Sequence, residues 1–183
     1  MKAGAVHGRF QPFHNGHLRY VLEARRKIDF LWVGITMCNL ASLDKTFATG
    51  SREDPENNPL TFFERLNIVA DALVENGVDR SEFGFVPFPI ETPERLPEFM
   101  STDVPCYTTV CEPWNERKIE RLRKVGYEVT VLYREHPKKI SGSAIREDIV
   151  KGGNLWKGLV PEATVRAVEG LNLRDRLISL RLK

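Results

Sequence analysis

The feature that most constrains this chain is a segment near its start that changes from strand-like to helical across one short loop. Residues 4–6 are small or apolar, Gly8 and Gly16 bound a loop, and apolar residues at 18, 21 and 22 follow at helical spacing. Apolar runs and helical spacing are the main sequence signals of local structure. The segment therefore predicts a strand, a phosphate-binding loop and a helix.

The start of this predicted helix suits a phosphate group. A helix that begins after a glycine-bearing loop presents unpaired N–H groups and the positive end of its dipole. His14 and His17 are three residues apart, so both rings share a face of the first turn and point toward the anion. Arg9 adds a cation, and Gly8 and Gly16 permit close approach of the backbone to the ligand. We expect the segment to bind a polyphosphate.

Two histidines at this spacing also fit an exposed helical pair or half of a zinc site. Zinc needs three or four ligands, and no matching His/Cys cluster follows in the sequence. Cys38, Cys106 and Cys111 are scattered and form no C-x-x-C pair, which favours core or strand thiols over metal ligands. We therefore predict a phosphate site and no protein-bound metal.

Composition excludes several classes of protein. The 183 residues are 42% hydrophobic and 28% charged, as in a globular protein, and we expect one domain over 1–183. A net charge of +2 argues against a nucleic-acid partner, and no apolar run approaches the ~18 residues that span a membrane. Three cysteines, an odd number, without a secretory signal indicate a reducing, cytoplasmic setting.

Apolar runs alternate with helical patterns along the rest of the chain. Thr61 and Glu64 fit a capping box at the start of a helix over 61–73. The apolar stripe of that helix is predicted to be Phe62, Leu66, Val69 and Leu73. The pattern predicts an α/β fold, a doubly wound, Rossmann-like sheet of five parallel strands with ligands outside the strands' carboxyl ends. Beyond the first segment, the expected strands are 30–36, 83–89, 104–110 and 127–133, and the other helices 15–28, 114–124, 160–171 and 173–182.

Residues 38–60 form a long polar stretch broken by one glycine and two prolines. A loop of this length in a compact domain is usually functional or mobile, and this one starts beside the phosphate loop. Lys45 and Arg52 either fold over a bound triphosphate or remain solvated charges. We expect an active-site loop.

The last part of the chain, residues 154–183, predicts the two C-terminal helices. Leu177, Leu180 and Leu182 are assigned to the core, and an oligomer face is the alternative. The Arg-rich last helix is expected to be a solvated surface.

A second helix start follows the last predicted strand. Ser141, Gly142 and Ser143 begin it, and Arg146 falls one turn along. Hydroxyl and free N–H groups at this start make a second phosphate site, to which Arg146 adds a guanidinium. The pattern alone also fits an ordinary capped helix.

Both segments resemble signatures of a known family. Residues 8–17, GRFQPFHNGH, are similar to the H-x-G-H signature of the nucleotidyltransferase superfamily, in the form of the archaeal-type nicotinamide-nucleotide adenylyltransferases. Residues 140–146 resemble that superfamily's I-S-G/S-T/S-x-I-R element, and the likeness extends over nearly the whole chain. The resemblance implies that both loops face the β- and γ-phosphates of ATP, with Mg²⁺, and that nicotinamide mononucleotide accepts AMP to give NAD. The site residues implied are Gly8, Arg9, Phe10, Gln11, His14, Gly16, His17, Asn115, Ser141, Ser143 and Arg146.

The same motifs indicate direct transfer. No Ser, Cys or Lys in them is placed with a base to act as a covalent nucleophile, so an acceptor phosphate would attack the α-phosphorus in line and release pyrophosphate. His14 and His17 would donate to the α-phosphate and bridging oxygens, where either ring can be cationic. Arg9, Arg146 and Mg²⁺ would neutralise the leaving group.

The chain departs from the adenylyltransferase pattern where the second substrate binds. The family has G-S-A-Q where this chain has TMCN at 36–39, and an Asn and a stacking Trp where it has Pro93 and Leu96, with Arg95 between. An adenylyl- or cytidylyltransferase acting on another phosphorylated acceptor is therefore an alternative. A non-catalytic nucleotide sensor is a third possibility. It is disfavoured because a protein that only binds a nucleotide does not need two histidines and an arginine to stabilise a transition state.

Overall fold

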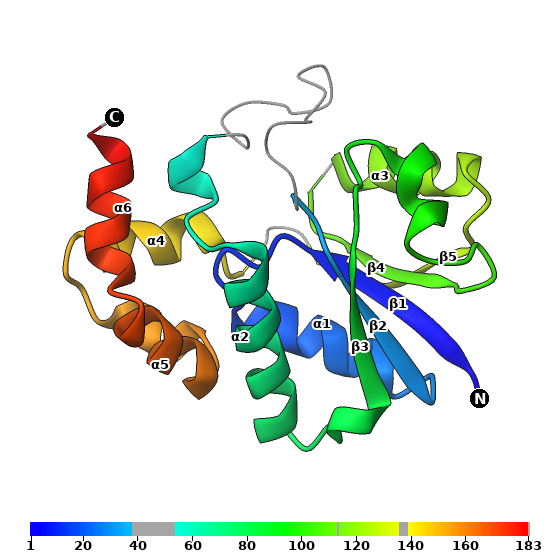
Figure 1. Ribbon diagram of the computed structural model, residues 1–183, viewed down its shortest axis with the longest axis horizontal. Helices are drawn as coiled ribbons and strands as arrows, with labels where there is room; N and C mark the ends of the chain where they lie inside the picture. Colours follow the sequence, from blue (N-terminus) through cyan, green and yellow to red (C-terminus); the bar gives the residue numbers. More distant parts are fainter. Residues whose placement is uncertain (38–53, 113, 136–138, 183) are drawn as a thin grey trace.

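The computed structural model describes residues 1–37, 54–112, 114–135 and 139–182, so the predictions for Cys38, Lys45 and Arg52 lie outside the described residues. A sheet of five parallel strands lies at the centre of the molecule (Figure 1). The chain winds outward from a central strand in both directions, which confirms the predicted doubly wound α/β fold. In spatial order the strands are β3 (Phe83–Pro87), β2 (Phe30–Ile35), β1 (Ala3–Gly8), β4 (Cys106–Val110) and β5 (Val129–Arg134).

The central strand β1 is buried on both faces. Ala5 and Val6 point to opposite faces and are both fully buried, as expected of a parallel strand covered by helices. β1 pairs along its whole length with β2, and Ala5 lies opposite Cys106 of β4. The carboxyl ends of these strands therefore meet at one edge of the sheet, where α/β proteins bind their ligands.

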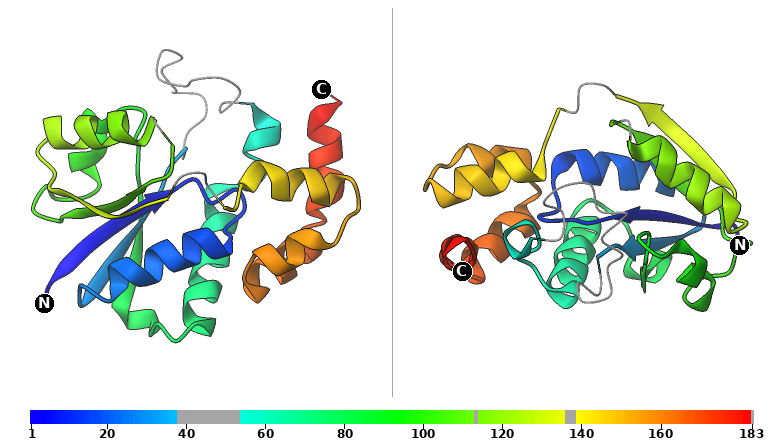
Figure 2. Two further views of the ribbon diagram at one scale, coloured as in Figure 1. Left: turned by 180° about the vertical axis from the view of Figure 1, so that it is seen from behind. Right: turned by 90° about the horizontal axis from the view of Figure 1, so that it is seen from above.

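Six α-helices lie in the described ranges: α1 (Asn15–Arg25), α2 (Phe62–Glu75), α3 (Trp114–Lys124), α4 (Gly142–Val150), α5 (Glu162–Gly170) and α6 (Leu173–Arg181). Residues of α1 and α2 share a hydrophobic cluster with Val6, whereas Ile119 and Leu122 of α3 share a second cluster with Ala5. Helices therefore cover both faces of the sheet. The three C-terminal helices gather beside α2, away from α3 (Figure 2).

The start of α2 carries the predicted capping box. The Thr61 hydroxyl accepts a hydrogen bond from the Glu64 N–H at 3.2 Å, and the Glu64 carboxylate accepts one from the Thr61 N–H at 2.7 Å. The predicted apolar stripe is displaced, because Phe62 and Leu66 are only partly buried and Arg65 turns inward instead. The buried residues of α2 are Arg65, Ile68, Val69, Ala72 and Leu73.

The helix α6 is anchored to the start of α2 by a two-pronged ion pair. The Arg176 guanidinium donates to both oxygens of Glu64, at 2.8 and 2.9 Å. Of the leucines assigned to the core, Leu177 is fully buried and confirms the prediction. Leu182 is 83% exposed, so its assignment to the core is wrong; it follows the last residue of the helix.

Several strands begin or end two residues away from the predicted boundary. β4 and β5 begin two residues later than expected, and β3 ends two residues earlier, at Pro87. The late start of β4 follows Pro105, which has no N–H to donate to the sheet. None of the described helices combines the length and apolarity needed to cross a bilayer.

Candidate active site

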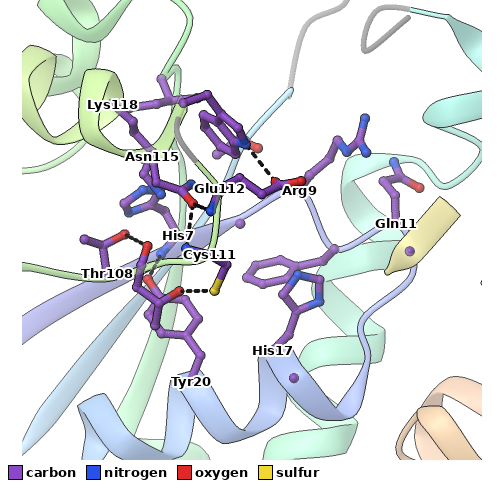
Figure 3. Close-up of a pocket in the computed structure, with 18 of the residues that line it drawn as sticks. His7, Arg9, Gln11, His17, Tyr20, Thr108, Cys111, Glu112, Asn115 and Lys118 are labelled. Carbon is purple, nitrogen blue, oxygen red and sulfur yellow. Dashed lines mark hydrogen bonds between the residues drawn. The ribbon is translucent and has the colours of Figure 1, made fainter. Parts of the chain in front are cut away.

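A cavity of about 920 Å³ opens at the carboxyl ends of the parallel strands (Figure 3). Its walls come from the loop after β1, the start of α1, the ends of β4 and β5, the helix α3 and the turn before α4. The two helix starts identified in the sequence thus converge on one space. The predicted site residues that line it are Gly8, Arg9, Phe10, Gln11, His14, Gly16, His17, Asn115, Ser141 and Ser143.

The two histidines of α1 cap the helix for each other. The Nδ1 atom of His14 accepts from the His17 N–H at 3.3 Å, and Nδ1 of His17 accepts from the His14 N–H at 3.4 Å. Their rings stack with centroids 3.6 Å apart. A ring that accepts through Nδ1 has its N–H on Nε2, so this arrangement leaves the Nε2–H group of each ring as a donor. A proton on Nδ1 of either ring would break one cap.

The loop between β1 and α1 is shaped by aromatic packing. Phe10 has a positive φ of 54° and is 1% exposed. Its ring lies edge-on to that of His17, with centroids 5.1 Å apart. A Cβ atom at Gly8 would lie 2.4 Å from the Phe10 ring, so this glycine makes room for the phenyl group. The position of the His17 ring thus depends on a residue that also lines the cavity.

The second helix start touches the first loop directly. A Cβ atom at Gly142 would lie 2.9 Å from the carbonyl oxygen of Gln11. The same oxygen accepts from Nη1 of Arg146 at 2.6 Å, and Nη2 of Arg146 donates to Ser143 Oγ and to Asn57. Arg146 is 3% exposed and lies behind the cavity wall, where burial lowers its pKa. In this structure Arg146 joins the two loops.

Two further side chains hold the loop after β1 in place. The Gln11 amide exchanges hydrogen bonds with the backbone of Leu60, donating to its carbonyl at 2.8 Å and accepting from its N–H at 3.0 Å. Arg65, which is 2% exposed, donates to the carbonyl oxygens of Arg9 at 2.9 Å and Thr36 at 2.6 Å. Both side chains fix the backbone that bears the predicted phosphate site.

The opposite end of the cavity is lined by polar residues that sequence reasoning did not assign, apart from Asn115. His7 at the end of β1, Thr108 on β4 and Lys118 on α3 are each at most 6% exposed. Figure 3 shows His7, Asn115 and Lys118 grouped across the cavity from His17 and Gln11. A polar residue inside a buried strand, close to its carboxyl end, is the sequence signal that would have found His7 and Thr108.

His7 has an unusual environment. Its ring stacks on Phe88, with centroids 4.4 Å apart and planes 4° from parallel. Neither ring nitrogen has a hydrogen-bond partner among the described residues. Burial, and secondarily the charge of Lys118, hold the pKa of His7 well below its ordinary value. The ring is therefore neutral.

Two side chains hold the backbone at the cavity floor through hydrogen bonds. The Tyr20 hydroxyl of α1 accepts from the His7 N–H at 3.0 Å and donates to the Tyr107 carbonyl at 2.7 Å. Oδ1 of Asn115 accepts from the N–H groups of Cys111 and Glu112, at 3.0 and 2.9 Å. Asn115 therefore fixes the turn between β4 and α3.

Positive charge exceeds negative charge around the cavity. Among the described lining residues, seven are arginine or lysine and four are glutamate. Such an excess attracts anionic substrates. Those residues are Arg9, Arg19, Arg117, Lys118, Arg121, Lys124 and Lys139 against Glu91, Glu112, Glu120 and Glu135.

The comparison with known proteins places the chain in a family. The model of the Cytidylyltransferase-like family matches residues 5–148, which include both helix starts. This protein belongs to the Cytidylyltransferase-like family. It is therefore a nucleotidyltransferase, an enzyme of the class that both helix starts indicate.

Curated relatives divide between two activities. The chain is 37% identical, over 95% of its length and 94% of the relative's, to phosphonoformate cytidylyltransferase of Streptomyces viridochromogenes. It is 29% identical to the nicotinamide-nucleotide adenylyltransferase of Picrophilus torridus, over 94% of each chain, and 26% identical to that of Saccharolobus solfataricus, over 97% and 95%.

Solved structures share the fold at lower identity. One is a bifunctional NMN adenylyltransferase/ADP ribose pyrophosphatase from Francisella tularensis, complexed with AMP and a manganese ion, with a TM-score of 0.66 and 15% identity. The match covers 97% of this chain, which spans about half, 52%, of that longer protein. A putative nicotinate-nucleotide adenylyltransferase from Vibrio parahaemolyticus gives a TM-score of 0.56 at 16% identity, covering 95% and 96% of the two chains.

Proposed function

We propose that this protein transfers the cytidylyl group of CTP to a small phosphonate or phosphate acceptor and releases pyrophosphate. The main support for nucleotidyl transfer is that two helix starts converge on one cavity. One bears His14 and His17, and the other bears Ser141 and Ser143. The 37% identity to a phosphonoformate cytidylyltransferase supports CTP and a small phosphonate as substrates.

The chemistry follows from the donors at these helix starts. An oxygen of the acceptor's phospho group attacks the α-phosphorus, a new O–P bond forms, and the bond from the α-phosphorus to the bridging oxygen breaks as pyrophosphate leaves. The acceptor oxygen is already anionic, so the step needs no general base. The Nε2–H groups of His14 and His17 donate to the phosphate oxygens as their charge grows. Removing one such preorganised donor typically costs about 10²–10³ in kcat.

Mg²⁺ fits this proposal as an ion that arrives on the triphosphate. Among the described residues, no group of three or more His, Cys, Asp or Glu side chains could hold a metal ion. Magnesium commonly binds through substrate phosphates and retained waters. When bound it would neutralise the phosphates, and we assign it no protein ligand.

Adenylyl transfer to nicotinamide mononucleotide is the second candidate. The GRFQPFHNGH segment and the archaeal relatives at 26 and 29% identity favour it. The position matched to the family's stacking tryptophan counts against it, because Leu96 is fully buried in a hydrophobic cluster with Phe88 and Met100. That leucine offers no surface to a nicotinamide ring.

The two candidates are separated by pyrophosphate release from four substrate pairs, CTP or ATP with phosphonoformate or nicotinamide mononucleotide, each with Mg²⁺. We expect the pair of CTP and phosphonoformate to turn over fastest. Preference for ATP with nicotinamide mononucleotide would select the second candidate, and no release with any pair would contradict nucleotidyl transfer to these acceptors.

The His17→Ala variant tests the assigned role of the histidine pair. We expect kcat to fall at least about 10²-fold while CTP binding, measured by calorimetry, weakens far less, because the donor acts most strongly on the charge that develops during transfer. Equal losses in turnover and binding would contradict the role.

A further inference from the structure

Several groups that donate hydrogen bonds line the end of the cavity beneath α3, and the Glu112 carboxylate on the same wall accepts from Nε1 of Trp114 at 2.8 Å. The Asn115 carbonyl oxygen is already used by two backbone N–H groups, so its NH₂ group is what this side chain offers to a ligand. Lys118 is 6% exposed and contributes a positive charge at this end. Thr108 adds a hydroxyl group, which donates a long hydrogen bond of 3.5 Å to the Thr109 carbonyl oxygen.

His7 is the least satisfied member of this group. It is 5% exposed, lines the cavity and has neither ring nitrogen bonded to a described residue. Leaving a buried polar group without a partner is energetically unfavourable. Stacking on Phe88 fixes the plane of the ring, so the edge that bears its N–H is held in one orientation. A ligand in the cavity would supply the missing partner.

We infer that His7, Asn115 and Lys118 form a subsite for a carboxylate carried by the acceptor in addition to its phospho group. This inference rests on the proposed function and adds a substrate class to it, small acceptors with two acidic groups. A carboxylate is acceptor-only when ionised, so it complements a set of N–H donors and one buried cation.

A carboxylate fits these residues better than a neutral group does. Lys118 is largely removed from water, and a charge held away from water acts more strongly on a carboxylate beside it than a solvated charge would. The negative charge of the carboxylate would also offset the Lys118 charge, which contributes to the lowered pKa of the His7 ring. An acceptor held here by one end would present its phospho group toward the centre of the cavity, on the side of His17 (Figure 3).

The test compares two small phosphonates at saturating CTP. Phosphonoacetate carries a carboxylate and methylphosphonate does not. We expect the wild-type enzyme to show a KM about tenfold or more lower for phosphonoacetate, as one charge-assisted hydrogen bond would give. The His7→Phe variant keeps a ring to stack on Phe88 but has no N–H, and we expect the ratio of the two KM values to fall most of the way to one.

A second variant and a binding measurement keep the result decisive. Lys118→Gln should reduce the same preference if His7→Phe does not fold. In the wild-type protein, the ring ¹⁵N resonances of His7 should shift on addition of phosphonoacetate but not of methylphosphonate, with or without turnover. Variants that retain the wild-type preference, or unmoved His7 resonances, would overturn the subsite and leave the transfer reaction standing. A shift of those resonances with no turnover of any pair would overturn the proposed function alone.

Discussion

Replacing Gly142 by alanine tests whether the two helix starts must touch for the site to work. The new Cβ atom would lie 2.9 Å from the Gln11 carbonyl oxygen, whereas ordinary contacts begin near 3.4 Å. The turn before α4 would therefore move by ~0.5 Å relative to the loop after β1, because the atom it meets belongs to the backbone. The Arg146 hydrogen bond to the same oxygen, 2.6 Å long, would have to adjust as well.

Two opposing free energies act on the stability of this variant. Overpacking costs about 1–3 kcal/mol, and alanine in place of glycine in a helix returns up to ~1 kcal/mol. We expect a net loss of ~0–2 kcal/mol, which at ~2–4 °C per kcal/mol lowers Tm by no more than ~8 °C. Catalysis should suffer more, since a misplacement of ~1 Å can cost ~10²-fold and half of that about tenfold.

Steady-state kinetics with CTP and differential scanning calorimetry measure the two effects separately. Gly170→Ala is the matched control, because a Cβ atom at Gly170 would meet nothing within 4 Å. We expect the control to keep wild-type kcat/KM and the Gly142 variant to lose about tenfold. Unchanged kinetics in the Gly142 variant would refute the claim that contact between the loops sets the geometry of the site.

Two other variants probe the residues around the cavity. Arg65→Lys replaces a fork of donors by a single ammonium group, so we expect a loss of about 2 kcal/mol and a Tm lower by ~4–8 °C in a thermal melt; an unchanged Tm would mean that the carbonyl contacts of Arg65 are dispensable. His7 has a lowered pKa in the folded protein, so the unfolded chain takes up its proton first as pH falls below ~6.5, and stability drops by up to ~1.4 kcal/mol per pH unit. His7→Phe should remove this part of the acid sensitivity, measured as the free energy of unfolding in urea titrations between pH 7.5 and 5.5. If that free energy falls with pH equally in variant and wild type, His7 is not a buried, neutral imidazole.

The sheet and the helix starts could be predicted from the sequence because their signals are local. β2 is an apolar run and is recognisable from a few consecutive residues, and the capping box at Thr61 and Glu64 lies within one turn. The placement of both phosphate loops at one edge follows from the parallel arrangement of the strands, whose carboxyl ends share that edge. The predicted fold and the predicted positions of the histidines and serines rest on these local features.

The contacts that complete the site could not be predicted, because they join residues far apart in the chain. Arg146 binds the Gln11 carbonyl across 135 residues, and Gln11 pairs with Leu60 across 49. Arg65 lies outside the apolar stripe predicted for its helix, yet it is buried, and its guanidinium donates to backbone carbonyl oxygens. No periodicity in the sequence identifies the carbonyl partner of a buried guanidinium.

The mutual cap of His14 and His17 links the tautomer of each ring to the winding of α1. Each side chain accepts from the backbone N–H of the other, so a proton on Nδ1 of either ring would remove one of the two caps of the first turn. Asparagine and serine are good N-caps but have no Nε2–H to extend toward a phosphate. Substitution at either position can therefore preserve the turn and still abolish the donor, which makes the local architecture a poor guide to activity among distant homologues.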